Sequence, residues 1–142
     1  MPVKMPRRAA LLKERDIERT CTEFLELDGW RCIKTDLPHL RGLGVQEKGM
    51  ADRLYIRYHK PCKEHSMLLS IPYVCGAQRA EVMFIEWKRP NGKISAKQTE
   101  WHQLERKKGA LTLLAGVQFV PTIEGFREWY CKRSGLARKV LA

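Results

Sequence analysis

The residues best suited to chemistry in this sequence are Asp52 and the Glu-x-Lys pair made by Glu86 and Lys88. Residues two apart on a strand project from the same face, so Glu86 and Lys88 should project together while Trp87 points away. Two carboxylates can hold a hard cation that polarises a phosphate and lowers the pKa of the attacking water. A lysine ammonium beside them can neutralise charge that develops on the phosphate. These residue types therefore predict a site for phosphodiester hydrolysis.

The surroundings of these residues favour a functional interpretation. A Glu-x-Lys sequence by itself is most often part of a solvated salt-bridge face. Here Glu86 follows the apolar run 82–85, which indicates a buried central strand, and Asp52 directly precedes another apolar strand, after a loop that contains glycine. Charged residues are rarely buried without a partner, so their place at the ends of such strands supports a role in a site.

The first expected helix adds two more carboxylates. Glu14 and Glu18 lie one turn apart, close to the angular sector of the apolar residues Cys21 and Leu25. Carboxylates that border an apolar face are uncommon unless they are paired or bind a cation. The alternative is that each pairs with a basic residue at the helix margin, namely Lys13, Arg15 or Arg19.

Gln98 also has two interpretations. It stands three residues after Ser95, in the register of a capping box, where it would bond to the backbone N–H of Ser95. It could instead reach a scissile phosphate or an ordered water from the helix start, where exposed N–H groups favour anions.

Apolar periodicity and turn residues outline one α/β domain. Helices are expected at 11–28, 95–108 and 121–133, and strands at 30–35, 52–58, 81–87 and 111–115. The segment 36–51 contains one proline and three glycines and is expected to be a loop. The segment 59–80 is less regular and could form a hairpin extension with a further short strand at 67–71. The order is α-β-β-(β)-β-α-β-α, with residues 1–9 and 136–142 as flexible basic ends.

Length and composition agree with a single domain that binds a polyanion. The chain has 142 residues, 44% of them apolar, which suffices for one compact core. Its 27 Lys and Arg against 16 Asp and Glu give a net charge of +11, which attracts nucleic acid. The sequence lacks a long apolar run and a secretory signal, so we expect a soluble, cytoplasmic protein without membrane contact.

The cysteines predict free thiols. There are five of them, without a CxxC pair, and an odd count argues against a disulfide framework. Cys21 and Cys32 have the character of small core residues. A zinc site could be imagined from His59, Cys62 and His65, but the tight paired spacings of structural zinc sites are missing, and a polar loop is preferred.

Taken together, five short motifs resemble the virus-type replication-repair nuclease (VRR-NUC) domain, a branch of the PD-(D/E)XK nucleases. The motifs are Glu14-x-x-Ile17, Gly29-Trp30, Gly49-Met-Ala-Asp52, Phe84-Ile-Glu86-Trp-Lys88 and Ile94-Ser-Ala-Lys-Gln98. They span nearly the whole chain in one order. The resemblance implies a restriction-endonuclease-like fold, a central mixed sheet flanked by helices, and Mg²⁺- or Mn²⁺-dependent cleavage of DNA without a nucleotide cofactor.

The resemblance also implies roles for individual residues. Asp52 and Glu86 would be metal ligands, together with the backbone carbonyl of Trp87. Lys88 would be the catalytic lysine and Gln98 the characteristic helix glutamine. The helix glutamate of the site matches Glu14 by its spacing to Ile17, whereas alignment with related junction resolvases favours Glu18. The usual proline before the first aspartate is replaced by Ala51, and the interval between Asp52 and Glu86 is longer than in a minimal member.

The expected substrate is branched DNA, either a flap or a four-way junction. Small stand-alone members resemble junction resolvases, so a homodimer is expected because a junction presents two symmetric scissile phosphates. The size and family would suit a phage origin, with the protein in a bacterial or phage-infected cell. Candidate phosphate contacts are Arg41, Lys48, Arg89, Lys93 and Lys97, with Lys132, Arg133, Arg138 and Lys139 in the C-terminal region.

Two alternatives belong to other classes. The first is a non-catalytic nucleic-acid-binding module with a nuclease-like fold, although such a module would be expected to lose a ligand from the set Asp52, Glu86 and Lys88. The second is an RNA-directed basic protein, which would need exposed aromatic residues for stacking. Tyr55, Tyr58 and Trp87 lie in strands that are expected to be mostly buried.

Overall fold

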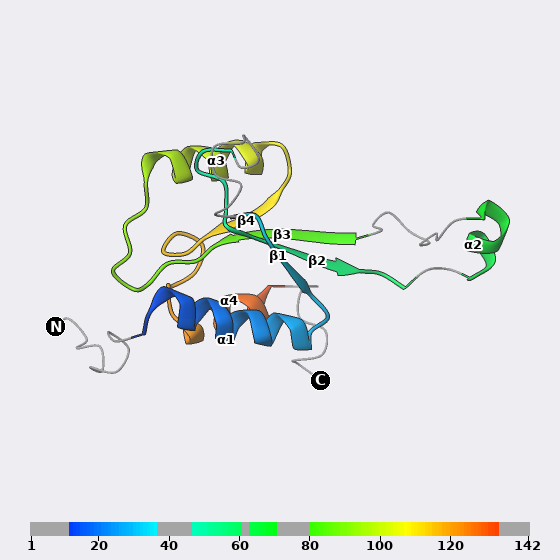
Figure 1. Ribbon diagram of the computed structural model, residues 1–142, viewed down its shortest axis with the longest axis horizontal. Coiled ribbons are helices and arrows are strands. Elements are labelled where there is room, and N and C mark those ends of the chain that lie inside the picture. Colours follow the sequence, from blue (N-terminus) through cyan, green and yellow to red (C-terminus); the bar gives the residue numbers. More distant parts are fainter. Residues whose placement is uncertain (1–11, 37–46, 61–62, 71–79, 134–142) are drawn as a thin grey trace.

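A computed structural model describes residues 12–36, 47–60, 63–70 and 80–133 of the chain, and Figure 1 shows how these parts are arranged. Their elements in order are α1 (Glu14–Leu27), β1 (Arg31–Lys34), β2 (Arg53–Tyr58), α2 (Lys63–Leu69), β3 (Ala80–Glu86), α3 (Ala96–Lys107), β4 (Leu111–Leu114) and α4 (Ile123–Lys132). The strands form a four-stranded sheet in the order β1-β2-β3-β4. The first two pairings are antiparallel and the pairing of β3 with β4 is parallel. The predicted α/β class and mixed sheet are confirmed.

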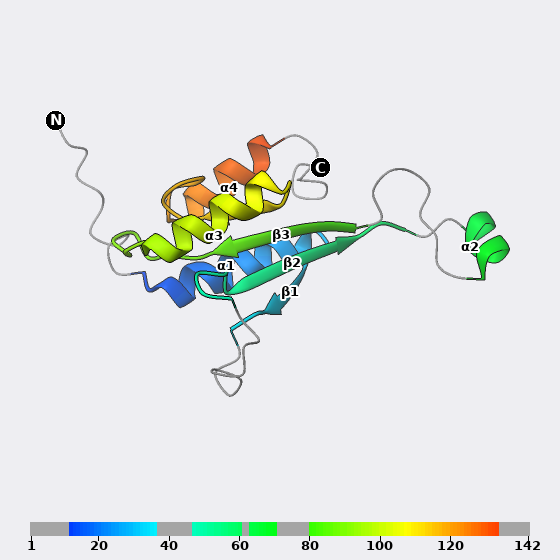
Figure 2. The same ribbon diagram turned by 90° about the horizontal axis from the view of Figure 1, so that it is seen from above.

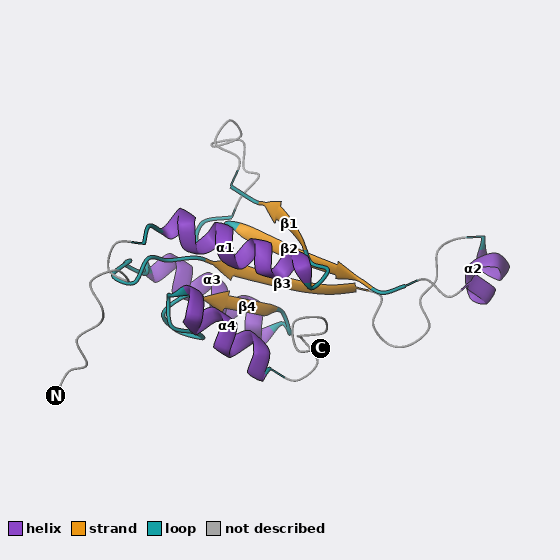
Figure 3. Ribbon diagram, turned by 90° about the horizontal axis from the view of Figure 1, so that it is seen from below, coloured by secondary structure: helices purple, strands orange, loops and turns teal. Residues whose placement is uncertain are grey.

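The helices cover both faces of the sheet. In Figures 1 and 2, α3 lies on one face, whereas α1 and α4 lie on the other, and Figure 3 shows α1 and α4 beside each other. Alternation along β3 explains the layers, because Met83, Ile85 and the following Trp87 belong to the buried core. Phe84, which faces the opposite way, meets the ring of Trp101 in α3, with 5.3 Å between ring centroids.

The first helix forms as its apolar pattern predicts. Ile17, Cys21 and Leu25 are fully buried, and Phe24 is partly buried against the core. Gly29, at a φ of +92°, follows the helix and turns the chain toward β1. Leu11, which belongs to the same predicted pattern, lies outside the described residues.

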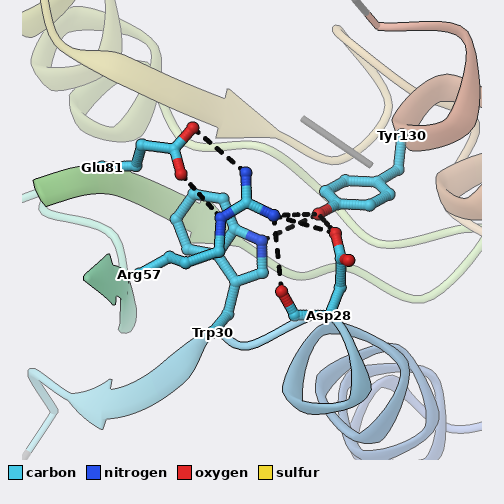
Figure 4. A network of polar contacts seen from close by, with 5 residues as sticks. All are labelled: Asp28, Trp30, Arg57, Glu81 and Tyr130. Atoms are coloured by element: carbon cyan, nitrogen blue, oxygen red, sulfur yellow. Dashed lines mark hydrogen bonds and ion pairs between the residues drawn. The ribbon is translucent and has the colours of Figure 1, made fainter. Parts of the chain in front are cut away.

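A buried polar network holds one end of the sheet together (Figure 4). The side chain of Arg57 in β2 is 2% exposed and donates to Asp28 at the end of α1 and to Glu81 in β3, at 2.9 and 2.6 Å. Tyr130 of α4 donates to Asp28 and accepts a 2.8 Å hydrogen bond from the indole of Trp30. The network therefore ties α1, α4 and two strands together through paired charges.

The segment between β2 and β3 corrects one prediction. The predicted short strand at 67–71 is wrong as far as the structure describes it, because Lys63–Leu69 forms the helix α2. Three consecutive apolar residues, Met67, Leu68 and Leu69, fit the period of a helix and that of a buried strand equally well, so their pattern cannot distinguish the two. All three are exposed, and α2 lies beyond the ends of β2 and β3, away from the other helices (Figure 1).

The structure also tests the predictions about individual aromatic residues and cysteines. Tyr55 and Trp87 are buried as expected, but Tyr58 at the end of β2 is 59% exposed. Cys21, Cys32 and Cys131 are free thiols, whereas Cys62 and Cys75 lie outside the described residues. So do the expected flexible ends and most of the 36–51 loop, including His39 and Arg41. Among the helices that are described, none has the length and apolar character needed to cross a membrane.

Candidate active site

The two central carboxylates meet because of the register between β2 and β3. Arg53 pairs with Ile85 in this antiparallel ladder, which sets Asp52, just before β2, opposite Glu86 at the end of β3. The backbone N–H of Asp52 donates to Glu86 Oε2 at 3.2 Å. The structure therefore brings together residues that are 34 positions apart. The Arg57 network lies toward the other end of the same two strands.

Glu86 is the most enclosed group of the site. Its side chain is 3% exposed and lies 3.6 Å from the ammonium of Lys88, measured from Oε1 to Nζ. Burial, and then repulsion from Asp52, raises the pKa of Glu86 to about 7, although the charge of Lys88 opposes the shift. The predicted common face of Glu86 and Lys88 is confirmed by this contact, and Trp87 points into the core as expected.

Gln98 performs its capping role and also contacts the site. Its backbone N–H donates to Ser95 Oγ, and its side-chain oxygen accepts from the Ser95 N–H, each at 3.1 Å. The other end of the same amide, Nε2, donates to Glu86 Oε1 at 3.0 Å. The capping interpretation of Gln98 is confirmed, and the same side chain also orients Glu86, whereas its contact with a phosphate or an ordered water stays a prediction.

The two helix glutamates have different surroundings. Glu18 accepts a 2.5 Å charge-assisted hydrogen bond from Arg53 Nε, so its partner comes from β2 rather than from the helix margin. Burial raises the pKa of Glu14, the charge of Lys88 opposes this shift, and the charge of Asp52 adds to it. Glu14 therefore shares the electrostatic environment of the site, whereas Glu18 is used in positioning Arg53.

Arg53 is a residue of the site that the sequence reasoning missed. Besides bonding to Glu18, it donates through Nη1 to the carbonyl of Asp52 at 2.8 Å. It therefore links α1 to the backbone that carries Asp52. No sequence signal distinguishes it from the other basic residues of the chain, because its role depends on the packing of α1 against the sheet.

The donors present fit a divalent cation with few protein ligands. In the part of the chain that the structure describes, three or more His, Cys, Asp or Glu side chains never gather closely enough to hold a metal ion. Asp52 and Glu86 remain as a carboxylate pair, and Mg²⁺ commonly keeps several waters and uses one or two carboxylates. A cation would also relieve the repulsion that raises the pKa of Glu86. Direct ligation by Glu14 or by the Trp87 carbonyl stays a prediction.

Two clefts lie beside the carboxylates. The larger, of about 820 Å³, is formed between the start of α1 and the turn after β3, and its lining includes Glu14 and Lys88. The smaller, of about 500 Å³, is formed between the loop before β2 and the start of α3, and its lining includes Asp52 and Gln98. Four predicted phosphate contacts line the clefts: Arg89 and Lys93 in the larger, and Lys48 and Lys97 in the smaller.

The larger cleft also contains basic residues that the sequence reasoning did not assign to phosphate binding, Lys13 and Arg15. Of the C-terminal candidates, Lys132 pairs with Glu128 at 2.7 Å and Arg133 lies over the ring of Trp129. Both therefore have partners on α4 itself. Arg138 and Lys139 lie outside the described residues.

Comparison with known proteins finds no matching family model, no matching curated protein and no matching solved structure. The structural class of this protein is therefore taken from its own fold and site. It is an α/β protein with a four-stranded mixed sheet, and a carboxylate pair, a lysine and a glutamine meet at one end of that sheet.

Proposed function

We propose that this protein is a Mg²⁺- or Mn²⁺-dependent DNA nuclease with a restriction-endonuclease-like core of the VRR-NUC type. The observation that carries the proposal is the meeting of Asp52, Glu86 and Lys88 at the end of the β2–β3 pair. Gln98, from the start of the next helix, completes the group. Asp52, Glu86, Lys88 and Gln98, which belong to three of the five motifs that resemble the family, thus lie together although they come from separate elements. The net charge of +11 supports a polyanionic substrate.

In this proposal each side chain has a distinct task. Asp52 and Glu86 would hold the cation, which when bound polarises the phosphate and lowers the pKa of the attacking water. Lys88, 14% exposed, is accessible enough for its ammonium to meet the phosphate and stabilise the charge that develops there. Gln98 keeps the Glu86 carboxylate oriented. Glu14 lies close enough to influence Lys88 and Asp52 electrostatically.

The substrate proposed is branched DNA, a flap or a four-way junction, cut by a homodimer. Basic residues line both the cleft beside Lys88 and the cleft beside Asp52, which supports a DNA strand that extends beyond the scissile phosphate. A two-fold dimer would supply two such sites for the symmetric phosphates of a junction.

A non-catalytic nucleic-acid-binding module is the second candidate. It is favoured by the ion pair between Lys88 and Glu86, since the lysine can neutralise the buried carboxylate without a metal. The two candidate functions can be told apart by experiment, because a nuclease cleaves DNA and needs a divalent cation to do so, whereas a binding module only binds it.

The deciding experiment is cleavage of labelled linear duplex, flap and four-way junction with Mg²⁺, with Mn²⁺ and with chelator. Wild type should cut in a metal-dependent manner, and Asp52→Asn and Glu86→Gln should not. Glu128→Gln is the matched control, because Glu128 lies on the exposed face of α4 and pairs with Lys132. Tight binding by wild type without any cutting would support the binding module instead, and paired symmetric nicks would identify a resolvase.

A further inference from the structure

We propose that Trp101 is a positioning residue that holds the Asp52 loop, residues 47–52, against α3 and so sets the separation of Asp52 and Glu86. This inference rests on the proposed function, because it concerns how the same site is assembled. Trp101 contacts Glu47, Phe84 and His102, and it would act on Asp52 through the loop. Its indole Nε1 donates to Glu47 Oε2 at 2.8 Å, across 54 positions of sequence.

The Asp52 loop approaches α3 very closely. Gly49, at a φ of +86°, lies so near the first turn of α3 that a Cβ there would be 2.2 Å from the carbonyl oxygen of Lys97. A turn precedes Asp52, in which the N–H of Met50 donates to the carbonyl of Glu47 at 3.1 Å. Glu47 is therefore the residue through which the upstream end of this turn is tied to the helix.

The indole ring is well placed to hold this loop. Trp101 is 7% exposed and stands edge-on to Phe84, the residue two before Glu86 on β3. It lies on α3, the helix that begins with the Gln98 turn. From α3, the helix that carries Gln98, this one side chain thus contacts both the strand that carries Glu86 and the loop that carries Asp52.

The downstream side of Asp52 is fixed by other contacts. Its carbonyl accepts from the backbone N–H of Thr35 at 3.0 Å and from Arg53 Nη1 at 2.8 Å. The carbonyl of Ala51 likewise accepts from Thr35 Oγ1. Loss of the indole hydrogen bond should therefore loosen the turn at residues 47–50 while the sheet stays paired. The expected result is weaker cation binding rather than unfolding.

The test compares the same substitution, tryptophan to phenylalanine, at two positions. Trp101→Phe removes the N–H but keeps an aromatic ring beside Phe84. Trp30→Phe removes the indole hydrogen bond to Tyr130 in the network at the other end of the sheet. The measurements are the Mn²⁺ concentration for half-maximal cleavage and direct Mn²⁺ binding by calorimetry. Groups that orient metal ligands typically change affinity about 10-fold to 100-fold, so Trp101→Phe should raise the Mn²⁺ requirement by about that factor. Trp30→Phe should lower the melting temperature and leave the Mn²⁺ requirement unchanged.

Variants of the acceptor separate the hydrogen bond from a general loss of packing. Glu47→Gln retains a side-chain oxygen that can accept from the indole, and it should stay near wild type. Glu47→Ala should match Trp101→Phe, and the double variant should be no worse than either single variant, because both remove the same interaction. A wild-type Mn²⁺ requirement in Trp101→Phe would overturn the proposal.

A readout without metal or DNA keeps this inference distinct from the nuclease proposal. Hydrogen exchange of the Met50 and Asp52 amides, which donate to Glu47 and Glu86, should become faster in Trp101→Phe and not in Trp30→Phe. Unchanged exchange would refute the positioning role even if the wild type is active. If exchange is faster in Trp101→Phe but the wild type neither binds Mn²⁺ nor cuts DNA, the role of Trp101 is supported and the nuclease is refuted.

Discussion

Replacing Glu86 by glutamine should make the metal-free protein more stable at high pH while abolishing cleavage. Glu86 is 2% exposed, and its folded pKa of about 7 lies above the ordinary glutamate value of 4.5. A raised pKa means that the folded state binds the proton more tightly than the unfolded state. The stability contribution of this group is therefore fully present below pH 4.5 and is lost as the pH rises through about 7.

The size of the effect follows from the pKa difference. Each pKa unit corresponds to about 1.4 kcal/mol, so the wild type should lose roughly 3 kcal/mol from this carboxyl between low pH and pH 8. The glutamine variant lacks the ionisation and keeps an oxygen that can accept from Gln98 Nε2. Constant differences in hydrogen bonding between the two side chains cancel when the same pair of proteins is compared at two pH values.

The assay is urea denaturation at pH 5 and pH 8 in the presence of chelator. The stability difference between Glu86→Gln and wild type should grow by roughly 2–3 kcal/mol in favour of the variant from pH 5 to pH 8, because the unfolded carboxyl is already mostly ionised at pH 5. Glu128→Gln, on the exposed face of α4, should follow the wild type with pH. A difference between Glu86→Gln and wild type that stays constant with pH would refute the argument that Glu86 is desolvated and repelled by Asp52.

Three further predictions test the rest of the molecule. Lys88→Met should abolish cleavage while leaving DNA binding largely intact, as measured by cleavage and band-shift assays, and loss of folding instead would make Lys88 structural. Arg57→Met should cost about 3–5 kcal/mol in urea denaturation, because it leaves Asp28 buried without its cation, and a cost under 1 kcal/mol would contradict the pairing in that network. DNA affinity should fall steeply with salt, and Lys93→Gln should reduce the slope of log affinity against log salt by about 1 whereas Lys132→Gln, already paired on α4, should not.

Local signals in the sequence were sufficient for most elements that position the site. The capping box of Ser95 and Gln98 forms as the spacing predicts, since its partners are three residues apart. The end of α1 near Gly29 was also predictable from local sequence, because glycine readily adopts the positive φ found there. Glu86 and Lys88 share a face because strand alternation persists just beyond the end of β3.

Features that depend on packing between distant elements could not be predicted. The contact between Arg53 and Glu18 forms only after α1 has packed beside β2, so no local pattern could distinguish the surroundings of Glu18 from those of Glu14. Tyr58 was expected to be buried because its strand is apolar, but it lies at the strand's exposed end. The loop contact between Glu47 and Trp101 joins residues 54 positions apart and carries no motif.

The alignment of β2 with β3 places the same requirement on folding and on chemistry. A shift of one residue in an antiparallel pair turns every side chain of the shifted strand to the opposite face. In β2 such a shift would turn Tyr55 out of the core, and it would also move Asp52 away from Glu86. A chain with misaligned strands would thus expose apolar surface and lose its carboxylate pair together. Cellular quality control that removes proteins with exposed cores would, as a by-product, remove the molecules with an incorrectly assembled site.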